Sequence, residues 1–112
     1  MVNNVGDSLE KYMDVLSARQ KLVASNIANV DTPGYHTKDL DFQSEFASHL
    51  NGATLSAGTE APGLRVNNDG NNVSLDREAR LLSENSIRFS TATNLLKAQF
   101  RVLRTAIHEG QA

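Results

Sequence analysis

Hydrophobic side chains recur every seven residues near the beginning of the chain, between residues 5 and 30. One series holds four apolar residues, and a second series holds two, with the polar Gln20 between them. The members are Leu9, Leu16, Val23 and Val30 in the first series and Met13 and Ile27 in the second. Because a helix brings residues at this spacing onto one face, the pattern predicts an amphipathic helix over residues 5–30.

A second apolar stripe of the same kind lies between residues 76 and 108. It consists of Leu82, Phe89, Leu96 and Leu103 at one heptad position, with Phe100 and Ile107 at the alternate position. At a rise of 1.5 Å per residue the two helices would be roughly 39 and 50 Å long, which is too long for a compact domain of this size. The sequence therefore predicts a mainly α fold, in which two long terminal helices pair as an antiparallel, coiled-coil-like hairpin.

The residues between the two predicted helices, 31–75, differ in composition. Residues 51–70 hold four of the seven glycines and one of the two prolines. This composition predicts a turn and a flexible connector, which can form a short β-hairpin where Asp69-Gly70 separates residues 64–66 from residues 73–75. We expect these three parts to form one domain of 112 residues.

Two antiparallel helices cover only one stripe each, so several large side chains are left over. These side chains point away from the predicted seam and belong to Tyr12, Leu22, Leu81, Leu95 and Val102. Aromatic residues make up only 5% of the chain and Trp is absent, so few large side chains are present to close a core. We therefore expect the chain to complete its fold by packing against other chains, with its ends partly disordered in isolation.

Charge and cysteine content exclude several partners and chemistries. Eleven Lys and Arg against 13 Asp and Glu give a net charge of −2, without the cationic excess that binds nucleic acid. The absence of cysteine excludes disulfides and thiolate metal sites. We expect neither a membrane span nor a cleavable signal peptide, because the necessary apolar and basic segments are missing.

No group of residues has the spacing of a catalytic or metal site. His36, His49 and His108 share no metal-ligand spacing. The segment around Gly70 is only superficially similar to a calcium loop, because alignment on this glycine puts Arg65 at the first ligand position. We therefore expect no enzymatic activity, no metal and no cofactor.

The most specific motif of the chain lies at the end of the first predicted helix and directly after it. Its members are Asn26, Asn29, Asp31, Thr32, Pro33, Gly34 and Tyr35. Asn29 can cap the helix, while Pro33 and Gly34 fit the central positions of a type II turn, which requires positive φ at the second. Tyr35 follows and can lock the turn against the helix.

The run from Ser17 to Tyr35 resembles the N-terminal signature of bacterial flagellar rod and hook proteins. With the segments 38–42 and 70–78, the chain is most similar to the basal-body rod proteins, in particular those of the proximal rod. The resemblance implies a structural subunit that associates with copies of itself and with other rod proteins into the helical tube of the drive shaft.

The same resemblance implies where the chain acts and what it meets. It would be exported through the flagellar type III apparatus without a cleavable signal, and would reside in the periplasmic rod of the basal body. Its neighbours there would be the other rod proteins, the rod adaptor subunit and the membrane ring.

Two interpretations stay open for Phe42 and Phe46. They form one face of a short helix expected over residues 41–50, and they are also similar to the Phe-x-x-x-hydrophobic element that the export gate recognises in this family. We favour the packing role. For the whole chain, the alternative function is a helical-hairpin adaptor or secretion chaperone of a type III export system, which would have similar stripes without the asparagine and proline motif.

Overall fold

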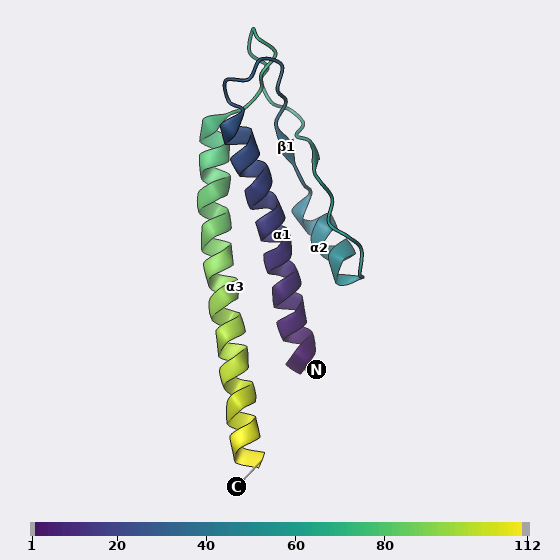
Figure 1. The fold of residues 1–112 in the computed structure, drawn as a ribbon, viewed down its shortest axis with the longest axis vertical. Helices are drawn as coiled ribbons and strands as arrows, with labels where there is room; N and C mark the ends of the chain where they lie inside the picture. The colour runs from purple at the N-terminus through teal and green to yellow at the C-terminus, as the bar shows by residue number, and fades with distance from the viewer. Residues whose placement is uncertain (1, 111–112) are drawn as a thin grey trace.

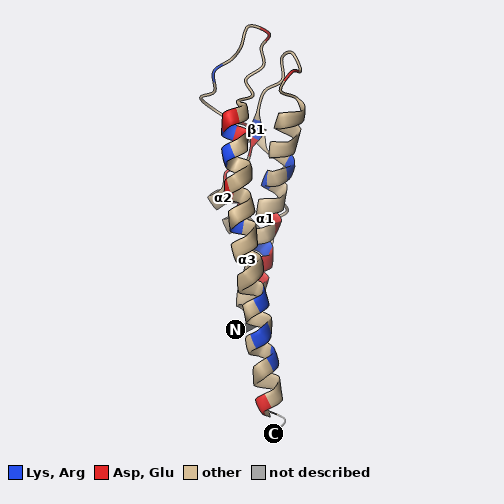
Figure 2. Cartoon of the chain, turned by 90° about the vertical axis from the view of Figure 1, so that its left-hand side faces the viewer, with Lys and Arg blue, Asp and Glu red and all other residues tan. Residues whose placement is uncertain are grey.

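The computed structural model describes residues 2–110 and forms an elongated hairpin of 70 × 25 × 17 Å. Two long helices, α1 (Val2–Ala28) and α3 (Leu75–Gly110), run antiparallel and are joined at one end by the connector (Figure 1). Because α3 has 36 residues and α1 has 27, α3 extends beyond the beginning of α1 at the opposite end (Figures 1 and 2). The predicted helical hairpin is therefore confirmed.

The helix boundaries differ from the predicted ones by one to three residues. α1 ends at Ala28 rather than at residue 30, because the Asn29 side chain donates to Ser25 O at 2.8 Å and caps the helix. Val30 consequently lies in the turn, outside the helix. At the start of α3, the Ser74 hydroxyl accepts a hydrogen bond from the Arg77 N–H at 3.2 Å, which is the geometry of an N-cap.

The connector contains a two-stranded sheet, but not at the predicted position. The strands are β1 (Lys38–Asp39) and β2 (Thr59–Glu60), which pair antiparallel with Lys38 opposite Glu60. The residues predicted to form the hairpin, 64–66 and 73–75, are not strands. The Asp69-Gly70 turn does form, with the Gly70 N–H donating to Asn67 O at 2.9 Å, but the segment after it binds the end of α1 through side chains.

A short helix, α2 (Phe42–Leu50), follows β1 and precedes β2 along the chain, and it packs on α1. Asp41 caps it by accepting from the Ser44 N–H at 3.4 Å. Its two phenylalanine rings contact Tyr12 edge-on, with centroid distances of 5.3 Å for Phe42 and 5.5 Å for Phe46. α1 is therefore the central helix, with α3 on one side and α2 on the other (Figure 1).

The centre of the contact between α1 and α3 lies on α3 beside the predicted stripe, not on it. Its buried residues are Glu78, Asn85 and Ala92, which recur every seven residues. Leu82 and Phe89, each four residues further on, are turned away by about 40° and lie exposed. Asn85 suits a buried seam position because its amide donates to Leu16 O at 2.8 Å and to Gln20 Oε1 at 3.1 Å.

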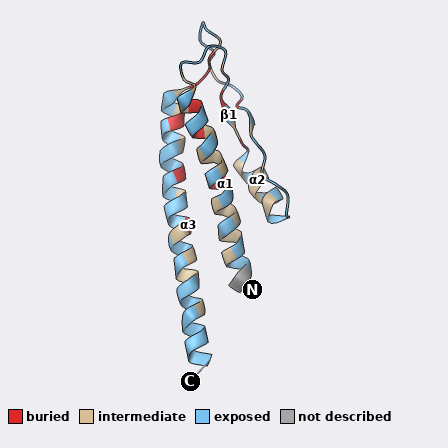
Figure 3. Cartoon of the chain, viewed as in Figure 1, coloured by how far each residue is buried: buried red, intermediate tan, exposed pale blue. Residues whose placement is uncertain are grey.

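The predicted packing residues consequently fall into three groups. Leu16 and Val23 of α1 are buried, and six others are half-buried: Leu9, Met13, Ile27, Val30, Leu96 and Leu103. The remaining four are exposed: Leu82, Phe89, Phe100 and Ile107. Figure 3 shows that the buried residues of α3 gather toward the connector, while its far end is exposed.

Candidate functional site

The end of the hairpin at which α1, β1 and the start of α3 meet is a buried polar junction. Asn26, on the last turn of α1, is 1% exposed and uses all four hydrogen-bonding positions of its amide. Nδ2 donates to Lys38 O at 2.9 Å and to Glu78 Oε1. Oδ1 accepts from the Lys38 N–H at 3.0 Å and from the Tyr35 hydroxyl at 2.9 Å. One side chain thus joins both long helices to the connector.

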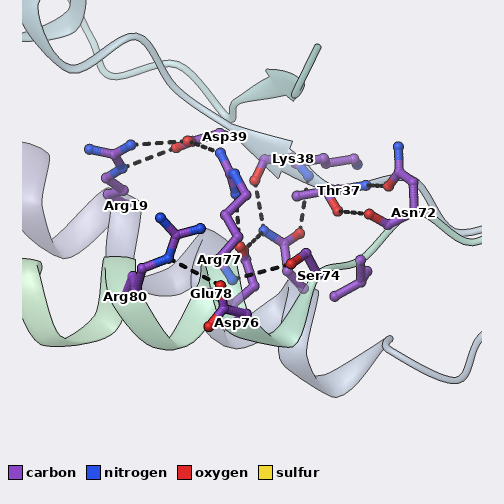
Figure 4. Close-up of polar contacts among 12 residues, drawn as sticks. Arg19, Thr37, Lys38, Asp39, Asn72, Ser74, Asp76, Arg77, Glu78 and Arg80 are labelled. Carbon is purple, nitrogen blue, oxygen red and sulfur yellow. Dashed lines mark hydrogen bonds and ion pairs between the residues drawn. The ribbon is translucent and has the colours of Figure 1, made fainter. Parts of the chain in front are cut away.

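A network of four charged side chains continues from Glu78 across the junction (Figure 4). Glu78 is fully buried and accepts from Arg77 Nη1 at 2.7 Å. Arg77 Nη2 donates to Asp39 Oδ2 at 2.6 Å, and Arg19 binds both oxygens of Asp39, at 3.1 and 3.0 Å. Two cations and two anions balance, so the network adds no net charge. Removal of Arg77 would leave the buried Glu78 without its ion-pair partner.

Asp39 is the centre of this network. Burial by itself raises the pKa of its carboxyl group, because desolvation disfavours the charged form. Hydrogen bonds from Arg19 and from the Leu40 N–H, together with the positive charge of Arg19, outweigh burial and hold the pKa of Asp39 below its ordinary value. The carboxylate is therefore ionised throughout the neutral pH range.

The predicted turn has the predicted geometry. Gly34 has φ of +76°, and the Tyr35 N–H donates to Thr32 O at 3.2 Å, as a type II turn with Pro33 and Gly34 at its centre requires. The turn lies against the connector, because the Gly34 N–H donates to Asp69 O at 2.9 Å. A Cβ on Gly70 would lie 3.2 Å from Gly34 Cα, so the two segments approach as closely as glycines allow.

Two buried asparagines fasten the segment before α3 to this turn. Asn71 donates to Asn29 O at 2.9 Å and to Thr32 O at 2.8 Å, so it satisfies carbonyl groups after the end of α1. Asn72 Oδ1 accepts from the Thr37 N–H at 2.6 Å. No buried side-chain nitrogen or oxygen atom of the described residues lacks a hydrogen-bond partner. The junction is therefore a closed polar unit.

The seven motif residues predicted from the sequence do not all take part in the junction. Asn26 and Tyr35 belong to it directly, while Asn29, Thr32 and Gly34 shape the turn beside it. Asp31 and Pro33 are exposed. The family resemblance rests on the segments 17–35, 38–42 and 70–78, but the sequence does not single out six members of the junction within them: Arg19, Asp39, Asn71, Asn72, Arg77 and Glu78. For Glu78 a signal was available, because Glu78, Asn85 and Ala92 recur every seven residues. Two of these three residues are polar, however, so the series does not form an apolar stripe.

Two of the three histidines, His36 and His49, form contacts at the surface. His36 pairs with Glu60 across the small sheet. Both ring nitrogens of His49 face acceptors, with Nδ1 2.9 Å from Ala53 O and Nε2 3.0 Å from Asp14 Oδ2. The hydrogen bond to Ala53, followed by that to Asp14, raises the pKa of His49 above its ordinary value of 6.5, because only the charged ring can donate to both.

Residues 2–110 contain neither a group of metal-binding side chains nor a helix suited to span a membrane. In this part of the chain, no three His, Asp or Glu side chains are grouped closely enough to hold a metal ion. None of its helices combines the length and the apolar character that a membrane crossing requires.

The opposite end of the hairpin carries large exposed apolar side chains. On α3, Ile87, Leu95 and Val102 are exposed on one side of the helical seam, and Phe89, Phe100 and Ile107 on the other. Contiguous apolar surface of this kind usually marks an interaction with another protein. The molecule therefore has a closed polar end and an open apolar end.

Comparisons with known proteins show similar sequences. Residues 13–36, from the middle of α1 through the turn, match the sequence model of a family described as "Flagella basal body rod protein". Three similar relatives carry the name "Flagellar basal body rod protein FlgB". They come from Borrelia hermsii, with 33% identity, Borreliella burgdorferi, with 29%, and Escherichia coli strain K12, with 26%.

These alignments extend over nearly the whole of both chains. Each covers 90% of the present chain, together with 93% of the two spirochaete proteins and 91% of the E. coli protein. They therefore include the polar junction and most of both long helices, and not only the segment around the turn. At 33% identity over this length, the chain belongs to the FlgB family of flagellar basal-body rod proteins.

Proposed function

We propose that the chain is a structural subunit of the proximal rod of the flagellum. It assembles with copies of itself and with other rod proteins into the tube of the drive shaft. Its further contacts are with the rod adaptor subunit and the membrane ring. The subunit is not an enzyme, and the polar junction keeps the two helices in register rather than binding a substrate.

The open apolar end is the observation that carries this proposal. Phe100 is 53% exposed and Val102 is 62% exposed, although both lie within a regular helix. An isolated soluble protein gains nothing from such side chains in water, whereas burial against a neighbour would contribute about 2 kcal/mol for each. Members of a tube wall have neighbours on every side, so the open surfaces of one subunit are covered by others.

The polar junction supports the same role in another way. A rod transmits torque, so its subunits need helices that do not slide past each other. Asn26 and Glu78 bind at fixed angles and distances, whereas apolar contacts tolerate sliding. The junction therefore provides a rigid end from which both helices extend.

Export through the flagellar type III apparatus fits the position of Phe42 and Phe46. Both rings are half-buried against Tyr12 in the folded chain. A gate that recognises these residues would have to meet them before α2 packs on α1. We therefore propose that the pair acts in export only while the chain is unfolded, and that it serves packing afterwards.

The experiment that tests this function follows the chain into the basal body. In cells that produce an epitope-tagged copy in place of the native gene product, we expect the tag in purified basal bodies and in the density of the rod. In solution, the purified chain should gain helix content by circular dichroism when other rod proteins are added. A stable small oligomer with full helix content at high dilution, absent from basal bodies, would favour the adaptor or chaperone alternative.

A further inference from the structure

An apolar groove lies where the three helices meet, on the open part of the hairpin. It has a volume of about 560 Å³ and is lined on α1 by Val5, Leu9 and Tyr12. α3 contributes Ile87 and Leu95 to the lining, and α2 contributes Phe46. The lining extends from Val5 to Tyr12 on one helix and from Ile87 to Leu95 on the other, which is about two helical turns. The groove thus has the length and chemistry to hold a short stretch of amphipathic helix.

The end of α3 has the pattern of a helix that binds in such a groove. Phe100, Leu103 and Ile107 follow one another at intervals of three and four residues, so they form one ridge. Phe100 and Ile107 are more than half exposed. This ridge cannot reach the groove of its own chain, because α3 is a single helix from Leu75 to Gly110 and the groove lies beside its middle.

Charge favours the same pairing. Residues 97–109 of α3 carry three cations and one carboxylate, a net charge of +2, and basic residues are visible along this part of the helix in Figure 2. Residues 4–14 of α1 hold three carboxylates and one lysine, and residues 41–50 hold two carboxylates, so each segment has a net charge of −2 with histidine counted as neutral. Two of the three segments around the groove are therefore acidic, whereas Arg88 is the only charged residue of the described chain that lines the groove itself.

The three cations at the end of α3 are also free to pair with a neighbour. They are Lys97, Arg101 and Arg104, and all three are exposed. No carboxylate of the described residues forms an ion pair with any of them. Approach to an acidic surface would therefore give these cations partners that they do not have within the chain.

We propose that the groove of one copy receives the end of α3 from a second copy. The inference rests on the proposed assembly into a rod and names one contact within it. In this contact, α3 of the second copy runs parallel to α3 of the first, and Leu103 of the second copy lies opposite Thr91 of the first. Phe100 of the second copy then lies beside Arg88 of the first, and Ile107 beside Leu95. The copies are then offset by twelve residues, or about 18 Å along the helix axis. The same contact can repeat from copy to copy, because groove and ridge are different surfaces.

Cysteine cross-linking tests this contact directly, because the chain has no cysteine of its own. Ser8 lines the groove at the level where Ile107 of the second copy would lie. We expect a mixture of Ser8→Cys and Ile107→Cys chains to form a disulfide-linked pair containing one of each, both in solution at high concentration and in purified basal bodies. Within one chain the two positions cannot be bridged, since Ser8 lies level with Leu95, about 18 Å along α3 from Ile107.

The matched control is Thr105→Cys, which is also exposed and only two residues away, but lies on the opposite side of α3. It should cross-link to Ser8→Cys much less than Ile107→Cys does. Equal or absent cross-linking in basal bodies that contain the chain would overturn this contact and leave the proposed function intact. Absence of the chain from basal bodies would instead count against the proposed function.

A second variant separates association from folding. Phe100→Ser should weaken self-association about tenfold or more, because it removes the central apolar anchor of the ridge. The melting temperature of the dilute chain should stay the same, because Phe100 is exposed there. Unchanged self-association in the Phe100→Ser variant would contradict the proposal.

Discussion

The two ends of the hairpin reverse the usual relation between polarity and burial. At the junction, the most buried side chains of α3 and of the end of α1 are Glu78 and Asn26, and both are polar. At the far end, large apolar side chains such as Phe100 and Ile107 are exposed. The buried hydrogen-bonding groups find partners within the chain, whereas much of the apolar surface stays exposed to solvent. Hydrogen bonds thus define the shape of the subunit, while apolar surface remains available for its neighbours.

The largest effect is expected at the centre of the closed end. Asn26→Ala removes four hydrogen bonds and leaves the Lys38 N–H and the Oε1 atom of Glu78 without their hydrogen-bond partner. The free energy of unfolding should fall by about 3 kcal/mol or more. Urea denaturation followed by circular dichroism measures this. Asn94→Ala, at an exposed position of α3, should change stability by less than about 0.5 kcal/mol. Similar losses in both variants would remove the contrast between the two ends.

A smaller effect is expected where the connector approaches the turn. Gly70→Ala puts a Cβ 3.2 Å from Gly34 Cα at a residue with φ of +87°, so it adds a clash to backbone strain. Gly63→Ala is the matched control, since Gly63 has φ of +74° but no atom near the added Cβ. We expect a loss of about 1 kcal/mol for Gly63→Ala and roughly 2–3 kcal/mol for Gly70→Ala, from urea midpoints. Equal losses would mean that the close approach contributes nothing.

Acid should weaken the closed end selectively. Because the pKa of Asp39 is lower in the folded chain than its ordinary value of 3.8, its stabilising contribution is complete well above this pH. The contribution is lost as the pH falls through the lowered pKa. The stability difference between the wild type and Asp39→Asn should therefore be largest near neutral pH and shrink below about pH 4. Thermal melts across this range measure it, and a difference independent of pH would contradict the network.

The smallest effect is expected at α2, beside the groove, and has the opposite pH dependence. The pKa of His49 is raised in the folded chain, so its contribution is present below the ordinary value of 6.5 and is lost as the pH rises through the raised value. The rate of backbone amide hydrogen exchange in α2, corrected for the intrinsic effect of pH, should therefore increase slightly when the pH rises above the raised pKa of His49. His49→Gln should abolish this change. Because Phe42 and Phe46 still hold α2 on α1, the helix should not detach.

The turn and the helices could be predicted because their signals are local. Proline fixes its own φ and glycine alone favours positive φ, so Pro33 and Gly34 specify their turn without reference to the rest of the chain. The two apolar stripes likewise specify helices, because periodicity is a property of each segment. The boundaries moved by only a few residues, since caps such as Asn29 and Ser74 decide them.

The seam of α3 and the charged network could not be predicted in the same way. Periodicity analysis gives weight to apolar residues, and here several of these, including Leu82 and Phe89, face outward. The interior positions carry Glu78 and Asn85, which become favourable only when particular partners stand opposite. Arg19 and Asp39 are twenty residues apart, so nothing in either segment alone indicates that they meet.

The junction also determines when the chain can fold. Its central hydrogen bond joins residues 52 positions apart, Asn26 and Glu78, and the intervening Asp39 must be in place as well. A chain drawn out in a narrow passage cannot bring these segments together, however favourable their bonds are. The polar junction can therefore form only when more than fifty consecutive residues are outside the passage at the same time. Under the proposed export route, the subunit would become rigid only after it leaves the passage.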